Sequence, residues 1–228
     1  MYTKSLGEIK AIALDIDGTL YRTWDLNFRM AFHFLHYNQF FLKYGLVRHD
    51  LHQNDILDNF TDKQAEYMSR RLKCSKAEAK TRLNDIVYDG LKHYFLKIKP
   101  CKGVKDFIIE AKSQGLKIAL LSDFPPEQKG DLWGIKEYCD VILGTEEIGA
   151  LKPSVFPFNV LAERLNVPAS QVLYIGNSHK YDIVGSKNAG MKAAWFITPI
   201  RAFLHMESKL ADISFYSYDK LKKILFEN

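Results

Sequence analysis

Short apolar runs alternate with longer amphipathic stretches over most of the chain. The first run, IKAIALD at residues 9–15, ends abruptly in carboxylates and is followed by Gly18. Four similar runs follow at residues 117–123, 140–145, 171–177 and 192–198. Runs of this length are typical of buried strands, and the stretches between them are long enough for helices. The alternation predicts an α/β fold, a doubly wound parallel sheet with helices on both faces.

Residues 21–99 follow a different pattern, with apolar residues at helical spacing and almost no glycine or proline. We expect Phe28, Phe32, Leu35 and Phe40 to lie in its first helix and to pack in a core. A later helix begins after Ser75, in a capping-box arrangement with Glu78. We therefore predict a helical cap insert at 21–99, called the helical insert below. Residues 1–20 and 100–228 would form the core domain.

The remaining sequence completes the predicted sheet. Residues 104–115 read as a helix that ends at a glycine. Residues 213–218 read as an edge strand, and residues 219–225 as a closing helix. With 228 residues, of which 47% are hydrophobic, the chain is large enough to bury a core without disulfides.

Cysteines and apolar segments narrow the class of protein further. The three cysteines, Cys74, Cys101 and Cys139, are widely spaced and include no CxxC pair. Neither a disulfide framework nor a structural zinc site is therefore expected. The opening segment is interrupted by acidic residues and does not read as a signal peptide, and no apolar run has membrane-spanning length. We expect a cytoplasmic protein without a membrane partner.

The formal net charge of +5 is concentrated in one segment. Residues 21–99 contain 14 Lys and Arg against 9 Asp and Glu, whereas the rest of the chain holds 18 of each sign. The same segment contains five of the seven histidines. This excess could guide an anionic substrate, or it could simply be the solvated surface of helices. No nucleic-acid partner is expected, because no motif combines basic residues with aromatic residues for stacking.

The strongest chemical signal is the hexapeptide at residues 15–20, Asp-Ile-Asp-Gly-Thr-Leu, directly after the first predicted strand. Two carboxylates, Asp15 and Asp17, would lie at the carboxyl edge of a buried sheet, where like charges are costly without a cation. Mg²⁺ prefers oxygen ligands and often works beside phosphate. The pattern therefore indicates a magnesium site.

This DxDGTL sequence resembles the first motif of the haloacid dehalogenase superfamily. The other motifs of the superfamily follow in order at later strand ends. Ser122 and Asp123 close the second strand, Lys152 precedes Pro153, and GNSHKYD at residues 176–182 follows the fourth strand. The resemblance covers residues 12–182, and its specificity lies in the order and placement of the motifs. It implies a Rossmann-like core with a helical cap, as in the phosphoglycolate phosphatase-like branch.

The resemblance also implies a role for each matching residue. Asp15 would attack phosphorus to give an aspartyl-phosphate, and Asp17 would act first as general acid and then as general base. Substrate and phosphate would be held by Thr19, Ser122, Asp123 and Lys152. The Mg²⁺ ligands would be Asp15, Asp17, Asn177 and Asp182. The implied activity is Mg²⁺-dependent hydrolysis of a small phosphorylated metabolite.

One position departs from the family pattern. Asn177 stands where the superfamily usually has a magnesium-binding aspartate. An amide oxygen can coordinate the metal but brings no charge, so metal affinity should fall, and Asp182 should supply the remaining carboxylate. The alternative reading is a binding or regulatory protein that has lost catalysis.

The same fold carries other activities in other proteins. Asp17 argues against a dehalogenase, which lacks an acid-base aspartate at this position, and the absence of membrane spans argues against an ion pump. A sugar-phosphate mutase shares all four motifs and the helical insert, and phosphonate hydrolysis through an insert lysine also fits. The sequence chooses neither a substrate nor an oligomeric state.

Overall fold

The computed structural model describes residues 6–53 and 56–227. Six strands in this part of the chain form one sheet, and every neighbouring pair is parallel. The strands are β1 (Ala11–Asp15), β2 (Lys117–Ser122), β3 (Val141–Gly144), β4 (Val172–Gly176), β5 (Lys192–Phe196) and β6 (Ile213–Phe215). Their spatial order, β3-β2-β1-β4-β5-β6, places β1 at the centre. The predicted α/β parallel-sheet fold is confirmed.

The five apolar runs all become strands, with ends trimmed by up to two residues. The predicted edge strand is shorter than expected and ends with β6 at Phe215, and the next helix, α11 (Tyr218–Phe226), begins one residue earlier than predicted. The helix predicted at 104–115 is α6 (Val104–Ser113), and it is followed by Gly115 at φ 79°.

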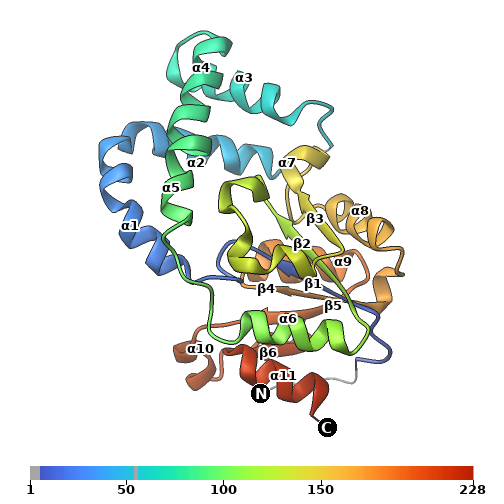
Figure 1. Cartoon of the computed structure of the whole chain (residues 1–228). Helices are drawn as coiled ribbons and strands as arrows, with labels where there is room; N and C mark the ends of the chain where they lie inside the picture. Colours follow the sequence, from blue (N-terminus) through green and yellow to red (C-terminus); the bar gives the residue numbers. More distant parts are fainter. Residues whose placement is uncertain (1–5, 54–55, 228) are drawn as a thin grey trace.

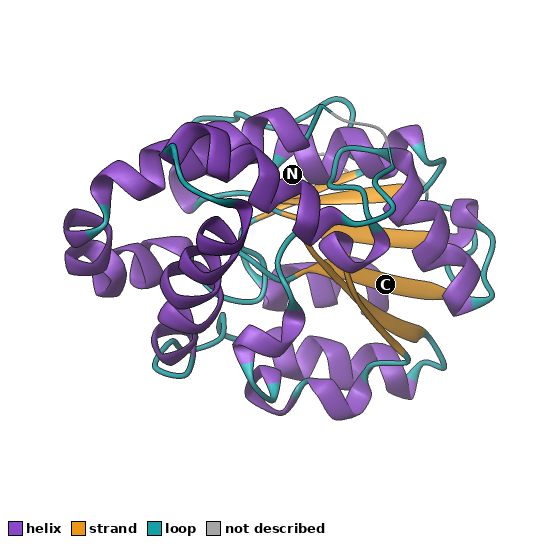
Figure 2. Cartoon of the chain, turned by 90° about the horizontal axis from the view of Figure 1, so that it is seen from above, coloured by secondary structure: helices purple, strands orange, loops and turns teal. Residues whose placement is uncertain are grey.

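The two faces of the sheet are packed by different sets of helices, as Figure 2 shows. In β1, Ile12 and Leu14 belong to the cluster that includes residues of α6 and α11. Ala11 and Ala13 point the other way, into the cluster that contains α8 (Val155–Leu165). This alternation is the two-residue period of a strand. All five residues of β1 are buried, which explains why the run is apolar throughout until Asp15.

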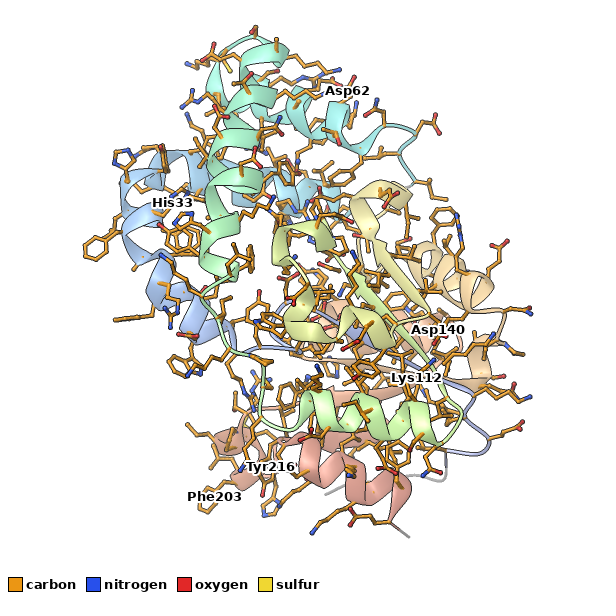
Figure 3. All side chains as sticks on the ribbon, in the orientation of Figure 1. His33, Asp62, Lys112, Asp140, Phe203 and Tyr216 are labelled. Carbon is orange, nitrogen blue, oxygen red and sulfur yellow. The ribbon has the colours of Figure 1, made fainter. Side chains whose placement is uncertain are left out.

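Short elements complete the core. They are α7 (Thr145–Ile148), α9 (Gly185–Asn188), α10 (Pro199–Phe203), the 3-10 helices η2 (Pro126–Lys129), η3 (Leu132–Gly134), η4 (Lys136–Tyr138) and η5 (Ala169–Gln171), and the π-helix η6 (His179–Val184). Lys112 at the end of α6 contacts both carboxylate oxygens of Asp140 just before β3, at 3.0 and 2.9 Å, and Figure 3 shows the two side chains near each other. Asp140 also accepts the backbone N–H of Ile118, so it links α6 to β2.

The segment between β1 and β2 is helical, and Figure 1 shows it above the sheet. It contains α1 (Thr23–His36), α2 (Asn38–Leu51), α3 (Phe60–Leu72), α4 (Lys76–Leu83), the π-helix η1 (Asn84–Tyr88) and α5 (Asp89–Phe95). Ser75 caps α4 as expected, since its side chain accepts the backbone N–H of Glu78. The two connections to the core meet where Tyr21 pairs with Pro100 in an antiparallel bridge. Division into two domains stays a prediction.

Two expectations for the helical insert were wrong. The first helix ends at His36, so Phe40 lies in α2 instead. Phe40 is buried, but Phe28, Phe32 and Leu35 are 81%, 84% and 66% exposed. Their spacing fits one face of α1, and that face is directed to solvent. Helical periodicity identified a face correctly without telling which side of it the core would occupy.

Two further observations concern the cysteines and the apolar segments. Cys74, Cys101 and Cys139 are free thiols. Among the described residues, no helix has both the length and the apolar character needed to cross a membrane.

Candidate active site

The predicted site residues come together at the carboxyl edge of the sheet. Asp15 ends β1, Ser122 ends β2, and Asn177 follows β4, which lies on the other side of β1. Parallel strands end at one edge, so three segments far apart in sequence meet there. Lys152 reaches the same place from the loop after α7, and Asp182 reaches it from η6.

Asp15 is a buried carboxylate with two partners. Lys152 Nζ lies 2.7 Å from its Oδ1, and the Thr19 hydroxyl donates to its Oδ2 at 2.9 Å. Burial raises the pKa of Asp15 to about 8 against the opposing charge of Lys152, and the nearby Asp182 and Asp17 add to the rise. The ammonium of Lys152 therefore does not fully offset the burial of Asp15 and the negative charges near it.

Lys152 joins Asp15 to Asp182. Its Nζ also lies 2.7 Å from Asp182 Oδ1, and all three side chains are at least 96% buried. Burial alone would lower the pKa of Lys152, but the two carboxylates outweigh it and raise that pKa well above its usual value. The second oxygen of Asp182 accepts the backbone N–H of Ser178 at 2.8 Å. This group holds two carboxylates against one ammonium.

Asp17 has an entirely different set of partners. Its Oδ1 accepts the Tyr21 hydroxyl at 2.7 Å, and its Oδ2 accepts the Ser122 hydroxyl at 2.7 Å. Lys129 Nζ lies 3.1 Å from the same Oδ2. Burial opposes ionisation of Asp17, but Lys129 and the hydrogen bonds from Tyr21 and Ser122 hold its pKa below the usual range. Asp17 is therefore held as a carboxylate.

Lys129 is a site residue that the sequence did not reveal. It is only 2% exposed, and its ammonium lies over the rings of Phe95 and Phe124, 5.1 and 5.5 Å from their centres. In the sequence it stands in PPEQKG, a turn-like segment in which a lysine normally faces solvent. No local signal marks it, because its burial depends on residues from the helical insert.

Asn177 and Thr19 lie on the other side of Asp15. The Thr19 hydroxyl is 3.5 Å from Asn177 Oδ1, so one hydroxyl faces both the Asp15 and the Asn177 oxygens. Gly18 adopts φ 92°, and a Cβ there would meet the Asn177 amide nitrogen at 2.2 Å. Only glycine fits at this close approach. Trp195 donates to the Asn177 backbone carbonyl at 3.0 Å and fixes the turn.

Asp123 has structural partners rather than a free carboxylate. Its Oδ1 accepts the Thr145 hydroxyl at 2.8 Å and the backbone N–H of Lys152 at 3.2 Å. The side chain thus supports the loop that carries Lys152. Its predicted part in binding substrate stays a prediction.

The helical insert contributes two further side chains. Arg48 of α2 forms a buried ion pair with Glu146 of α7 and donates to the Asp123 carbonyl at 2.8 Å. The His52 Nδ1–H donates to the Lys152 carbonyl at 2.6 Å, and the His52 ring stacks on Tyr181 with centres 4.5 Å apart. Of the five histidines in the insert, His52 is the one that lines the cavity described next.

A cavity of about 260 Å³ lies between the core and the helical insert. Asp15, Asp17, Lys152, Asn177 and Asp182 line it from the core. Arg48 and His52 line it from the insert. These five residues and Asp123, which also lines the cavity, come from the predicted set, so the structure brings six of its eight residues to one hollow, and Thr19 and Ser122 lie outside the lining.

Only some of the predicted metal ligands are placed so that they could bind one metal ion together. In the part of the chain that the structure describes, no three His, Cys, Asp or Glu side chains are arranged as a ready metal site. Asp17 points its carboxylate to Lys129, and Asp182 is bonded to Lys152. Asp15 and Asn177 nevertheless both line the cavity, and their oxygens suit a hard ion such as Mg²⁺.

Comparison with known proteins gives a consistent result. Residues 12–196 match the family model described as haloacid dehalogenase-like hydrolase. The pyrophosphatase PpaX of Halalkalibacterium halodurans is 29% identical over 196 residues, covering 82% of this chain and 83% of the relative. The protein of the same name from Bacillus thuringiensis strain Al Hakam is 23% identical and covers 96% and 95%.

Solved structures share the fold. A phosphatase of the haloacid dehalogenase type from Thermococcus onnurineus superimposes with a TM-score of 0.63 at 23% identity, covering 96% of this chain and 98% of that one. A 2-haloacid dehalogenase from Pseudomonas syringae gives 0.64 at 18% identity, with coverage of 96% and 99%. A predicted phosphoglycolate phosphatase from Haemophilus somnus gives 0.63 at 20% identity, with coverage of 95% and 97%.

Proposed function

The chain belongs to the haloacid dehalogenase-like hydrolases, and on that premise we propose that it hydrolyses small phosphomonoesters through an aspartyl-phosphate on Asp15. One observation carries the proposal. Asp15 and Asp17 stand two residues apart at the end of a buried strand, and each is paired with its own buried lysine. Burying two such pairs is costly, and a stable fold alone does not need them.

In the first step an oxygen of Asp15 attacks phosphorus, and the bond from phosphorus to the ester oxygen breaks. Lys152 and Thr19 fix the orientation of the Asp15 carboxylate for this attack. The covalent intermediate divides one difficult displacement into two easier ones. In the second step water attacks the same phosphorus and releases inorganic phosphate and the free carboxylate.

Asp17 serves both steps by moving one proton. It protonates the departing alkoxide and then accepts a proton from the attacking water. The structure supports the second role directly, since Tyr21, Ser122 and Lys129 hold Asp17 as a carboxylate. For the first role Asp17 must bind a proton before the leaving group departs.

Ser122 and Lys152 are the proposed phosphate-binding groups. The Ser122 hydroxyl is fully buried at the end of β2, and the Lys152 ammonium lies beside the attacking carboxylate. Donors that are already fixed in a site with little water stabilise the charge that spreads over the phosphoryl oxygens.

We propose Asp15, Asn177 and Asp182 as the residues that would hold Mg²⁺, with Asp17 joining them by a change in its present contacts. The metal would supply positive charge for the phosphoryl oxygens and for Asp15. The neutral amide of Asn177 should make this site weaker than one built with an additional aspartate.

The substrate is proposed to be a small soluble phosphorylated metabolite in the cytoplasm. The cavity of about 260 Å³ lies at the small end of the range for ligand sites and suits a small phosphate ester. Arg48 and His52 face it from the helical insert and would contact the leaving group. Pyrophosphate belongs in any substrate panel, because the curated relatives above carry the name pyrophosphatase.

The test is phosphate release from a panel of small phosphomonoesters and pyrophosphate, with Mg²⁺ titrated from micromolar to tens of millimolar. Wild type should turn over at least one compound in a Mg²⁺-dependent manner, and Asn177→Asp should reach half-maximal rate at lower Mg²⁺. Activity that appears only in Asn177→Asp would instead indicate a binding or regulatory protein. Conversion of a sugar phosphate to its isomer without phosphate release would indicate a mutase.

A further inference from the structure

Lys129 and Ser122 form a small buried network whose hydrogen bonds can be counted. The Ser122 oxygen accepts the backbone N–H of Phe124 at 3.1 Å and lies 3.3 Å from Lys129 Nζ. A hydroxyl has two acceptor positions and one proton to donate. Phe124 and Lys129 occupy both acceptor positions, so the Ser122 proton can only be donated outward. It now goes to Asp17.

The same ammonium holds Asp17. When a phosphoryl group takes the Ser122 proton, Asp17 loses that hydrogen bond and keeps Lys129 and Tyr21 as its donors. Lys129 therefore acts on both groups at once: it keeps Ser122 directed as a donor, and it keeps Asp17 in place after Ser122 has turned away.

The position of Lys129 depends on the helical insert. Its neighbour Gln128 is 6% exposed and donates its amide to the carbonyls of Val87 and Tyr88 at 3.1 and 2.7 Å. Both carbonyls belong to the π-helix η1, a local distortion of the kind often found at functional sites. Phe95 of α5 covers the Lys129 ammonium from the same side. The short helix η2 thus contacts the insert through one residue and the site through the next.

We propose that Lys129 is a positioning residue that orients Ser122 and Asp17 for phosphoryl transfer, and that Gln128 makes this placement depend on docking of the helical insert. The proposal rests on the proposed function for its kinetic consequences, but its geometric core does not. Lys129 contacts neither the phosphoryl group nor the ester oxygen in this scheme and acts through Asp17 and Ser122, which do.

The kinetic test compares Lys129→Met, Lys129→Arg and Gln128→Leu with wild type. Methionine has a similar length and suits a pocket walled by Phe95 and Phe124, so Lys129→Met should fold. It should lower kcat about 100-fold with KM changed less than about threefold, because displacing catalytic groups by about 1 Å has effects of that size. Lys129→Arg should recover at least about tenfold of the loss. Gln128→Leu, which keeps Lys129, should lower kcat about tenfold.

The matched control is Lys99→Met, since Lys99 is an exposed lysine on the connection to the core. It should match wild type. A kcat for Lys129→Met within about threefold of wild type, or a loss that arginine does not reduce, would overturn the positioning role. An unchanged kcat in Gln128→Leu would overturn its dependence on the insert.

A second measurement separates this proposal from the proposed function. Crystal structures of wild type and Lys129→Met should show the Asp17 carboxylate or the Ser122 hydroxyl displaced by about 1 Å or more in the variant. If both groups keep their wild-type positions, Lys129 does not position them. If wild type hydrolyses no phosphate compound, the proposed function fails, while the same pair of structures still decides the role of Lys129.

Discussion

The two aspartates at the end of β1 each pair with a buried lysine, but the two lysines lie in different parts of the molecule. Asp15 pairs with Lys152, and Lys152 in turn pairs with Asp182, so all three side chains of this group belong to the core, and the insert reaches it at the Lys152 backbone carbonyl, through His52. Asp17 pairs with Lys129 at the boundary with the helical insert, where Phe95 covers the ammonium. The first group should keep its geometry if the insert moves, whereas the second should not.

The difference suggests a division of labour. The attacking carboxylate lies at the end of a central strand of the sheet. The proton-transferring carboxylate lies at the boundary with the insert, so a movement of the insert would change its position. Tyr21, which donates to Asp17, also forms the bridge with Pro100 that joins the two connections. We expect substitutions in the core group to abolish chemistry and substitutions in the boundary group to weaken it.

Loss of the attacking carboxylate should have the largest effect. Asp15→Asn keeps the shape of the side chain but removes the nucleophile, so phosphate release should fall at least about 10⁴-fold. Steady-state assays on the best substrate of the panel measure this. A residual rate above about 1% of wild type would mean that Asp15 is not the nucleophile, provided that the preparation contains no contaminating phosphatase.

Removal of Lys152 should rank second. Lys152→Met takes a preorganised donor from the phosphoryl group and should lower kcat about 10² to 10³-fold. It also leaves Asp15 and Asp182 without their shared cation, which destabilises a buried site by about 3–5 kcal/mol. Thermal melting must therefore accompany the kinetics, and Lys152→Met combined with Asp182→Asn should recover part of the lost stability. A smaller kinetic loss than that of Lys129→Met would reverse the ranking of the two groups.

Tyr21→Phe should have a smaller effect, because it deletes one of three donors to Asp17. A single hydrogen bond contributes about 1 kcal/mol, which corresponds to about a fivefold loss in kcat. Tyr138→Phe, a tyrosine in η4 outside the cavity lining, is the control and should match wild type. An equal loss in both variants would mean that the effect does not pass through Asp17.

The last prediction concerns stability instead of rate, and its variable is pH. The folded-state pKa of Asp15 is raised to about 8 from 3.8, so its contribution to stability is full below the unfolded value and is lost as pH rises toward 8. In metal-free buffer the melting temperature of wild type should therefore fall relative to that of Asp15→Asn as pH rises from 5 to 8, by about 4 °C or more. A constant difference over this range would show that burial does not raise the pKa of Asp15 in the metal-free protein.

Much of the molecule was readable from the sequence alone. Five apolar runs predicted five strands, because a strand buried on both faces must be apolar along its whole length. The polar residues at the ends of the first two runs predicted that Asp15 and Ser122 would lie near each other, because parallel strands deliver their carboxyl ends to one edge. These inferences need only local pattern and chain order.

The tertiary structure decided what local pattern does not encode. Lys129 is buried and Phe32 is exposed, each the reverse of what its residue type suggests. Arg48 reaches the site from α2 of the insert, and Glu146 of α7 in the core balances its charge. Helical and strand periods define a face, but which face is buried, and which polar side chain is buried with it, depends on elements brought together from distant parts of the chain.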